Sequence, residues 1–261
     1  MNHTFFQLKS WITYWLNAVG AHSLHSPFYF DLYTNTIRTR AVDPDLKNIE
    51  GLRNKLLSDT ATLHVLDLGA GSVRLKGKTR MVRDIARVSL SPRKYSLLYK
   101  RIIQRYQCKT IIELGTSLGI NTLYLASSGA PLIMTFEGSP AIARTAQSVF
   151  DAAGTSNIKL ILGNIDHTLP DSLRSVSSVD FALLDAHHRY QPTLDYFEAL
   201  IPMTHSRTVI VIDDISYSKE MADAWSAIQQ HDKVQGTIDL FRCGIVLFDP
   251  SLNKQHVVLQ F

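Results

Sequence analysis

Residues 110–119 read TIIELGTSLG, an apolar run that ends in Glu113 and continues into a loop of small residues. This pattern is typical of a strand and the ligand-binding turn that follows it in nucleotide-binding proteins. Residues 63–72, LHVLDLGAGS, show a similar pattern. A single nucleotide-binding domain needs one such turn, so the two stretches have to be compared.

The later stretch has two features that favour a bound ligand. Gly115 and Gly119 allow the backbone to approach a small molecule, and the helix expected after the loop offers N–H donors at its start. The next strand, LIMTFEG, ends in Glu137 about twenty residues after the loop, where a carboxylate can accept both hydroxyls of a ribose. We therefore predict that the ligand binds at residues 113–119.

The earlier stretch lacks both features. It continues into VRLKGKTR, which is polar and basic, and no strand ending in an acid follows it. Neither stretch contains the dinucleotide pattern G-x-G-x-x-G. Arg74 stands where the third glycine would follow Gly69 and Gly71, and Ser117 stands where the second glycine would follow Gly115. NAD is therefore disfavoured as the ligand.

From Thr110 onward, apolar strands alternate with helices. Strands that are apolar throughout must be covered on both faces, which indicates a parallel sheet wrapped by helices. Only Arg242 and Cys243 separate the last two apolar runs, which favours an antiparallel hairpin. Residues 1–60 instead carry helical spacing, with Trp11, Trp15 and Val19 on one stripe and a helix start at Pro27.

The composition is that of one sizeable globular core with an appendage. The chain has 261 residues, of which 45% are hydrophobic and 19% charged. Its two cysteines, Cys108 and Cys243, lie in or beside apolar runs, so we expect no disulfide framework and a cytoplasmic, reducing location. Lys9 interrupts the apolar first twenty residues, which favours a buried or interfacial helix over a signal peptide or membrane span.

Five motifs in order carry a family resemblance: ELGTSLG, TFEG, LILGN, DFALLDAHHRY and VIVIDDI. The series resembles the class I S-adenosylmethionine-dependent methyltransferases, and among them the O-methyltransferases similar to catechol O-methyltransferase, over about residues 105–250. The resemblance implies an α/β, Rossmann-like, doubly wound seven-stranded sheet, mostly parallel, with a C-terminal antiparallel hairpin. Residues 1–104 resemble an uncharacterised bacterial branch, as an N-terminal helical extension with a basic insertion, before a cofactor-binding domain at 105–261.

The resemblance also implies S-adenosylmethionine as the cofactor. The matching positions for its methionine half are Glu113, Gly115, Thr116, Ser117 and Gly119. Glu137, followed by Gly138, matches the ribose position, and Gly163 with Asn164 matches an adenine position where members often have an acid. A purely structural role at the strand end is the alternative for Glu113 and for Glu137.

The reacting groups are expected at the carboxyl ends of the fourth and fifth strands of this domain. Asp185 ends one strand, and Asp213 and Asp214 end the next. In the metal-dependent members this arrangement supplies oxygen donors that suit Mg²⁺ or another divalent cation, which acidifies a bound hydroxyl. The open alternative is structural: Asp213 and Asp214 cap a helix, and Asp185 holds the cofactor.

One position departs from the family pattern. His188 stands where that pattern has a lysine that serves as general base. Histidine, with an ordinary pKa of about 6.5, is a competent base at neutral pH, so we expect His188 and Asp185 to be catalytic. A metal-free mechanism, in which His188 acts directly on the acceptor, is the alternative. The adjacent His187 is interpreted as structural or solvent-facing.

Residues 64–105 contain eleven basic side chains against two acidic ones, although the formal net charge of the chain is only +4. We interpret the GAGS turn and this basic block as an insertion that meets a small, anionic acceptor. The alternatives are a solvated helical face and a plain strand–turn pair. Nucleic-acid methylation is disfavoured because Asp185 is followed by Ala-His-His rather than Pro-Pro-aromatic. No membrane contact is expected. A non-catalytic cofactor-binding role and a homo-oligomeric state stay open as alternatives.

Overall fold

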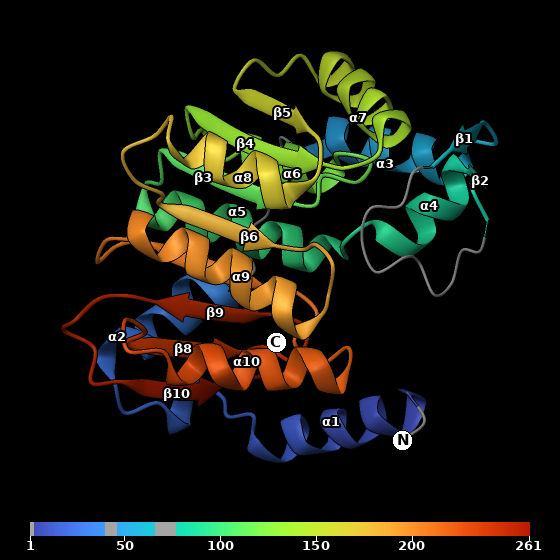
Figure 1. The fold of residues 1–261 in the computed structure, drawn as a ribbon. Coiled ribbons are helices and arrows are strands. Elements are labelled where there is room, and N and C mark those ends of the chain that lie inside the picture. Colours follow the sequence, from blue (N-terminus) through green and yellow to red (C-terminus); the bar gives the residue numbers. More distant parts are fainter. Residues whose placement is uncertain (1–2, 40–45, 66–76) are drawn as a thin grey trace. The chain divides into compact units, whose positions relative to one another are not determined.

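The computed structural model describes residues 3–39, 46–65 and 77–261 (Figure 1). Its contacts divide the chain into two compact units. Unit 1 combines residues 1–40 with residues 177–261, and unit 2 comprises residues 41–176. The predicted division at residue 104 was drawn from sequence character and stays a prediction.

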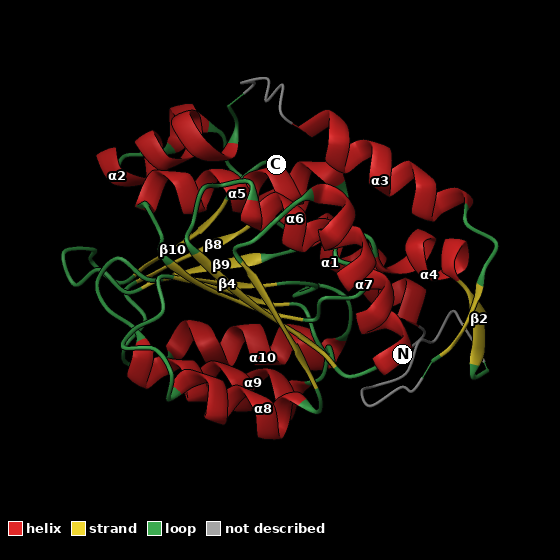
Figure 2. Ribbon diagram, turned by 90° about the horizontal axis from the view of Figure 1, so that it is seen from above, coloured by secondary structure: helices red, strands yellow, loops and turns green. Residues whose placement is uncertain are grey.

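Unit 2 is built on three parallel strands in the order β3-β4-β5, which are Thr110–Leu114, Leu132–Glu137 and Ile158–Leu162. Helices cover both faces of these strands, α6 and α7 on one side and α8 on the other (Figure 2). Their bounds are Ile120–Ala126, Pro140–Ala153 and Ile165–Leu173. The central side chains of β3 and β4 are buried, in agreement with their mainly apolar sequences, and Glu113 and Thr135 are the buried polar exceptions.

The first part of unit 2 contains a two-stranded antiparallel sheet of β1 (Thr62–His64) and β2 (Thr79–Met81), whose side chains are exposed or half-buried. Helix α3 (Lys47–Ser58) and helix α4 (Val82–Ser89) share a buried apolar cluster with α6 and α7. The loop of the LHVLDLGAGS stretch, with Asp67, Gly69, Gly71 and Arg74, lies outside the described residues. The antiparallel pairing of β1 and β2 is compatible with both interpretations of this stretch, which stay open.

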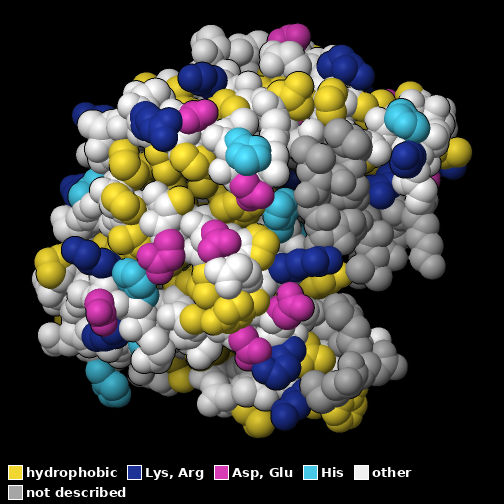
Figure 3. Space-filling view, viewed as in Figure 1, with side chains coloured by type: hydrophobic (Ala, Val, Ile, Leu, Met, Phe, Trp, Pro, Cys, Tyr) yellow, Lys and Arg dark blue, Asp and Glu magenta, His cyan; other side chains and the backbone are white. Residues whose placement is uncertain are grey.

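The C-terminal part of the basic block forms helix α5, Arg93–Tyr106. Leu98, Tyr99, Ile102 and Ile103 are each at most 1% exposed, whereas Arg93 and Lys94 are exposed. Arg93 and Lys94 therefore agree with a solvated helical face that covers core, whereas Lys100 is buried. Figure 3 draws the side of α8, α9 and α10, where Lys and Arg side chains, apart from the grey atoms, are scattered among acidic and histidine side chains.

Unit 1 contains five strands in the order β10-β8-β9-β7-β6. Their bounds are Phe181–Leu184 for β6, Val209–Ile212 for β7, Gly236–Asp239 for β8, Gly244–Leu247 for β9 and Gln255–Val258 for β10. Strands β6 and β7 are parallel, and β9 pairs antiparallel with both β7 and β8, which confirms the predicted hairpin. Strand β10, parallel to β8, is one more strand than the sequence predicted.

Helices also cover both faces of the unit 1 strands (Figure 2). Helices α9 (Tyr190–Leu200) and α10 (Lys219–Gln230) lie on one face, and α2 (Pro27–Leu32), continued by a π-helical turn at Tyr33–Ile37, lies on the other. The Tyr29 hydroxyl donates to the Gln255 carbonyl at 3.2 Å. The predicted helix start is confirmed, because Ser26 is extended and Pro27 is the first helical residue.

Helix α1 (His3–Asn17) packs on the rest of unit 1 through its more buried side. There the Tyr14 hydroxyl donates to the Leu259 carbonyl at 2.6 Å. Short 3₁₀ turns follow at Ala21–Ser23 and, later in the chain, at Ile201–Met203. Trp11 and Trp15 are 48% and 64% exposed, so the helix is not a buried one. Among the described residues, no helix combines the length and apolarity that crossing a membrane requires.

Candidate functional site

The carboxylate of Glu113, near the end of β3, is buried and accepts hydrogen bonds from three neighbouring side chains. It accepts hydrogen bonds from Asn121 Nδ2 at 2.8 Å, Thr122 Oγ1 at 2.5 Å and Thr135 Oγ1 at 2.6 Å. Burial raises the pKa of Glu113, and the three donors oppose that rise. The side chain therefore fixes the start of α6 to β3 and β4, next to the predicted ligand loop.

The loop after Glu113 requires glycine at two places. Gly115 has a φ of 104° and Gly119 a φ of 82°, both in the left-handed region. A Cβ added to Gly119 would lie 2.6 Å from the Phe150 ring. The N–H groups of Gly115 and Thr116 donate to the Phe136 carbonyl at 3.1 and 2.9 Å, which closes the loop against the end of β4.

The Glu137 carboxylate, at the end of β4, lies beside this loop. The N–H of Ser117 donates to Oε2 at 3.0 Å, and the N–H of Ser139, beyond Gly138, donates to Oε1 at 2.8 Å. Ser117 adopts an unusual φ of 50°. Two backbone donors thus fix the acid that the sequence predicted to bind ribose.

Gly163 and Asn164 follow β5. Gly163 has a φ of 142°, and its N–H donates to the Glu137 carbonyl at 3.0 Å. The Asn164 side chain accepts from the Asp166 N–H at 3.0 Å and is the N-cap of α8. The structure therefore gives Asn164 a capping role, while its contact with adenine stays a prediction.

In unit 1, Asp185, Asp213 and Asp214 follow the adjacent parallel strands β6 and β7, as predicted. The Asp213 N–H donates to the Leu184 carbonyl at 3.0 Å, which ties the two strand ends together. The Asp213 side chain is 1% exposed, whereas those of Asp185 and Asp214 are 18% and 25% exposed. Burial, followed by the charges of Asp213 and Asp214, raises the pKa of Asp185 well above its usual range.

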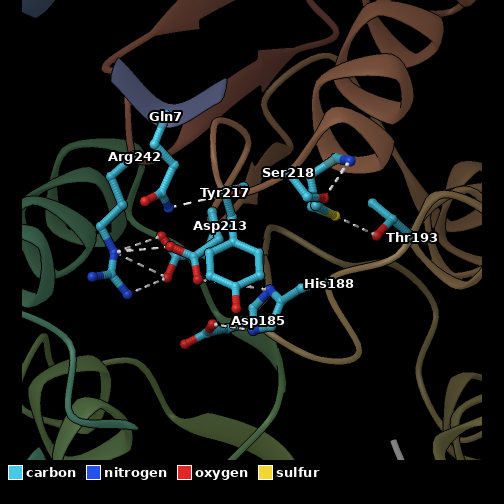
Figure 4. A network of polar contacts seen from close by, with 10 residues as sticks. Gln7, Asp185, His188, Thr193, Asp213, Tyr217, Ser218 and Arg242 are labelled. Atoms are coloured by element: carbon cyan, nitrogen blue, oxygen red, sulfur yellow. Dashed lines mark hydrogen bonds and ion pairs between the residues drawn. The ribbon is translucent and has the colours of Figure 1, made fainter. Parts of the chain in front are cut away.

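Arg242, in the turn between β8 and β9, extends its guanidinium to these acids (Figure 4). Its Nη2 lies 2.9 Å from Asp213 Oδ2, and its Nε lies 3.2 and 3.3 Å from the two Asp213 oxygens. The same Nε is 3.7 Å from Asp214 Oδ1. Sequence reasoning missed this residue and saw only a short connection.

A signal for Arg242 was present in the predicted hairpin. Strand β9 pairs antiparallel with β7 so that Gly244 lies opposite Ile212. The residues just before Gly244 must then lie near those just after Ile212, which places Arg242 close to Asp213. Register together with opposite charge predicts the pair once β9 is known to border β7.

His188 lies beside the acids but makes no short contact with them. Its Nε2 is 3.6 Å from Asp185 Oδ1, and its Nδ1 is 4.0 Å from Asp214 Oδ2. The Tyr217 ring lies alongside, with ring centroids 6.2 Å apart (Figure 4). His187 instead contacts the Tyr196 hydroxyl through Nδ1 at 3.1 Å, which supports a structural role.

The donors present do not fit a resident divalent cation. Both oxygens of Asp213 already accept from Arg242. Within the described ranges, no three His, Cys, Asp or Glu side chains form a group that could hold a metal ion. The predicted use of Asp185, Asp213 and Asp214 as metal ligands therefore lacks the ligand arrangement that it needs.

Comparison with known families agrees with this architecture. Residues 112–215 match the family model of a methyltransferase domain. Over this range the chain is similar to class I S-adenosylmethionine-dependent methyltransferases. The chain is 29% identical over 140 residues to a catechol O-methyltransferase of Niastella koreensis, an alignment that spans 52% of this chain and 62% of that protein. The chain thus spans less than two thirds of that relative's length.

Solved structures show the same Rossmann-like fold. A Podospora anserina methyltransferase bound to S-adenosylhomocysteine is 13% identical, with a TM-score of 0.59 over 86% of this chain and 97% of that chain. An O-methyltransferase from Bacillus cereus in complex with S-adenosylhomocysteine is 15% identical, with a TM-score of 0.57 over 84% and 97%. At these identities the likeness concerns the fold alone.

Proposed function

We propose that this methyltransferase binds S-adenosylmethionine in unit 2 and methylates a hydroxyl oxygen of a small molecule. The observation that carries the proposal is the Glu137 carboxylate, which the N–H groups of Ser117 and Ser139 fix beside a glycine-dependent turn. An acid in that position suits the two hydroxyls of a ribose. The match of residues 112–215 to a methyltransferase domain supports the same conclusion.

We assign the remaining loop residues to the binding of the cofactor's methionine half. Gly115 and Gly119 let the backbone approach a ligand, and Glu113 holds the loop and α6 in place through Thr122 and Thr135. Gly163 and Asn164 are retained as the proposed adenine contacts. When bound, S-adenosylmethionine supplies a methyl group on a positively charged sulfur that an oxygen nucleophile attacks in line.

The groups of unit 1 would handle the proton of the acceptor. His188 is proposed to accept the proton from the acceptor hydroxyl at a ring nitrogen. Asp214, whose carboxylate lies 4.0 Å from the ring, would stabilise the resulting imidazolium, and Asp185, at 3.6 Å, would orient the ring. The Tyr217 ring beside His188 would shield the proton transfer from water.

The acceptor is proposed to be a hydroxylated aromatic or a similar small molecule. The catechol O-methyltransferase of Niastella koreensis supports this class. We also propose that the acceptor carries an anionic group, because residues 64–105 contain eleven basic side chains against two acidic ones, although Arg93 and Lys94 themselves lie on a solvated face.

Calorimetry with S-adenosylhomocysteine tests the cofactor site. We expect Glu137→Ala to weaken binding by about 10-fold to 100-fold, because ribose hydroxyls lose charge-assisted hydrogen bonds. Glu220→Ala, at an exposed position in the first turn of α10, is the matched control and should bind like the wild type. An unchanged affinity in a folded Glu137→Ala variant would contradict the ribose assignment.

Methyl transfer to catechol as a probe acceptor tests the proposed base. We expect His188→Gln to lower kcat by about a hundredfold or more with little change in the affinity for S-adenosylhomocysteine. His22→Gln, at an exposed position, should leave both unchanged. A full rate in His188→Gln would exclude this histidine as the base.

A further inference from the structure

The position of Arg242 is fixed by the backbone around it. The Phe241 N–H donates to Asp239 Oδ1 at 2.7 Å, and the Leu240 N–H donates to the Cys243 carbonyl at 2.9 Å. The Arg242 carbonyl itself accepts from the Ile215 N–H at 3.0 Å, directly after Asp214. The turn between β8 and β9 is therefore bonded to the segment that carries the two aspartates.

This arrangement places a permanent positive charge, the guanidinium of Arg242, beside the acids. Arginine stays protonated at every accessible pH, and its planar fork matches the two oxygens of a carboxylate. Asp213, with a side chain 1% exposed, is an ion that could not remain buried without such a partner. Arg242 also reaches Asp214 at 3.7 Å, so one guanidinium serves both acids.

A divalent cation at the same acids would have to displace this guanidinium. Displacement would break the hydrogen bonds between Arg242 and Asp213 and would place two positive groups side by side in a half-buried region. Carboxylate pairs ordinarily call for a cation, and here the chain itself provides one. The usual electrostatic reason for a metal is removed.

We propose that Arg242 is the resident cation of this site and makes the methyltransferase independent of divalent metal. Arg242 holds Asp213 and Asp214 in place as a positioning residue, and His188 handles the proton of the acceptor without a Lewis acid. The inference rests on the proposed function for the identity of the acceptor step, but its main test uses cation binding rather than activity.

Paramagnetic resonance of Mn²⁺ titrated into the purified protein provides that test. We expect no saturable Mn²⁺ binding to the wild type at millimolar cation. Arg242→Met should bind Mn²⁺ at least about tenfold more tightly, because the acids lose their partner and accept a cation instead. Its Tm should rise with Mn²⁺, whereas the wild-type Tm should not. Arg174→Met, which removes an exposed arginine paired with Asp171, is the matched control and should behave like the wild type.

The wild-type titration decides the question even if Arg242→Met does not fold. Saturable Mn²⁺ binding to the wild type that Asp213→Asn abolishes would overturn the proposal. Methyl transfer to catechol that persists undiminished in EDTA would support it, and activity that EDTA removes and Mn²⁺ restores would overturn it. Loss of S-adenosylhomocysteine binding in the wild type would count against the proposed function alone, since the Mn²⁺ titration does not depend on the cofactor.

Discussion

At the scale of the residue, unusual backbone conformations coincide with the candidate site. Ser117, His188, Asp214 and Phe241 have φ values of 50°, 42°, 54° and 68°. Such conformations cost about 1 to 3 kcal/mol each for ordinary residues and persist where surrounding contacts enforce them. Ser117 directs its N–H to Glu137, and Phe241 precedes Arg242. The strain at these four residues therefore lies in or next to the candidate site, whereas Gln107 and Lys254, which also have positive φ, lie outside it.

Gly244 tests how tightly the segment after Arg242 is packed. A Cβ at this position would lie 2.5 Å from carbons of the Trp225 ring, on α10. We expect Gly244→Ala to lower the free energy of unfolding by about 1 to 3 kcal/mol, because neither β9 nor the indole can move without disturbing the core. Urea unfolding measures the change.

Gly51→Ala is the control for this substitution. Nothing lies within 4 Å of a Cβ at Gly51, inside α3. The free energy of unfolding should rise by about 0.5 to 1 kcal/mol, since alanine is the better helix former. Equal effects of the two substitutions would show that Trp225 does not restrict β9.

The pH dependence of stability tests the burial of the Asp239 carboxyl group. Burial raises the pKa of Asp239 above its ordinary value, so folding favours its protonated form. Its contribution to stability is present below about pH 4, the usual range for an unfolded aspartate, and is lost as the pH rises through the higher folded pKa. Asp239→Asn cannot ionise and escapes that loss. The stability of the variant relative to wild type should therefore improve as the pH rises from about 3 to about 7.

Urea unfolding at several pH values measures this difference, with Asp171→Asn as the exposed control. The control should show no comparable trend. A difference between Asp239→Asn and wild type that stays constant across the range would mean that folding does not shift the pKa of Asp239.

At the scale of the element, the sequence predicted those helices and strands that short-range patterns of apolar residues define. Strands β3 to β9 and helices α6, α7, α9 and α10 follow from apolar runs and helical spacing, because these strands, apart from the edge strand β5, are mostly buried within their units and the helices are amphipathic. Helix α8 was missed, since Pro170 interrupts its sequence and its start depends on the Asn164 cap. Strand β10 was missed because its first two residues, Gln255 and His256, are polar and exposed, and because it is defined by its pairing with β8.

The same limit applies to the candidate site. Glu113, Glu137 and the glycines belong to contiguous motifs and could be recognised one by one. The pair of Arg242 and Asp213 joins residues that are 29 positions apart, and only the register of β9 against β7 brings them together. A motif of acidic residues predicts a need for positive charge but does not show whether a metal or an arginine meets it.

Asn164 separates a capping role from a cofactor role. Asn164→Ala removes the acceptor for the Asp166 N–H and should cost about 0.5 to 2 kcal/mol of stability. Asn164→Ser caps a helix about equally well, adds no charge beside the Asp166 carboxylate that Asn164 Nδ2 contacts, and should largely retain the wild-type stability. Thermal unfolding of the two variants, with calorimetry of S-adenosylhomocysteine, compares the roles. If the serine variant were as unstable as the alanine variant, capping would not be the function of this side chain.

At the scale of the whole molecule, both ends of the chain contribute to one compact unit. Unit 1 draws on residues 1–40 and 177–261. The Val19 N–H donates to the Val258 carbonyl at 2.9 Å, and the Gln260 N–H donates to the Val19 carbonyl at 3.1 Å. The Tyr33 hydroxyl donates to the Gln260 carbonyl at 3.0 Å. The N-terminal segment is therefore part of the packing around β10 and not a detachable extension.

Removal of residues 1–38 tests this integration. Tyr29, Leu32, Tyr33 and Ile37 are each at most 5% exposed, so the deletion would uncover the face of β8 and β10 that they cover. Burial of each such side chain contributes about 1.5 to 3 kcal/mol, a combined loss comparable with the whole stability of a typical domain. We expect the truncated chain to lose its cooperative thermal transition and the amide-exchange protection of β10. Tyr29→Phe, which removes only the hydroxyl that reaches Gln255, is the control and should cost about 1 kcal/mol while preserving the transition. A truncated protein that unfolded at the wild-type Tm with β10 still protected would show that the N-terminal helices are an appendage after all.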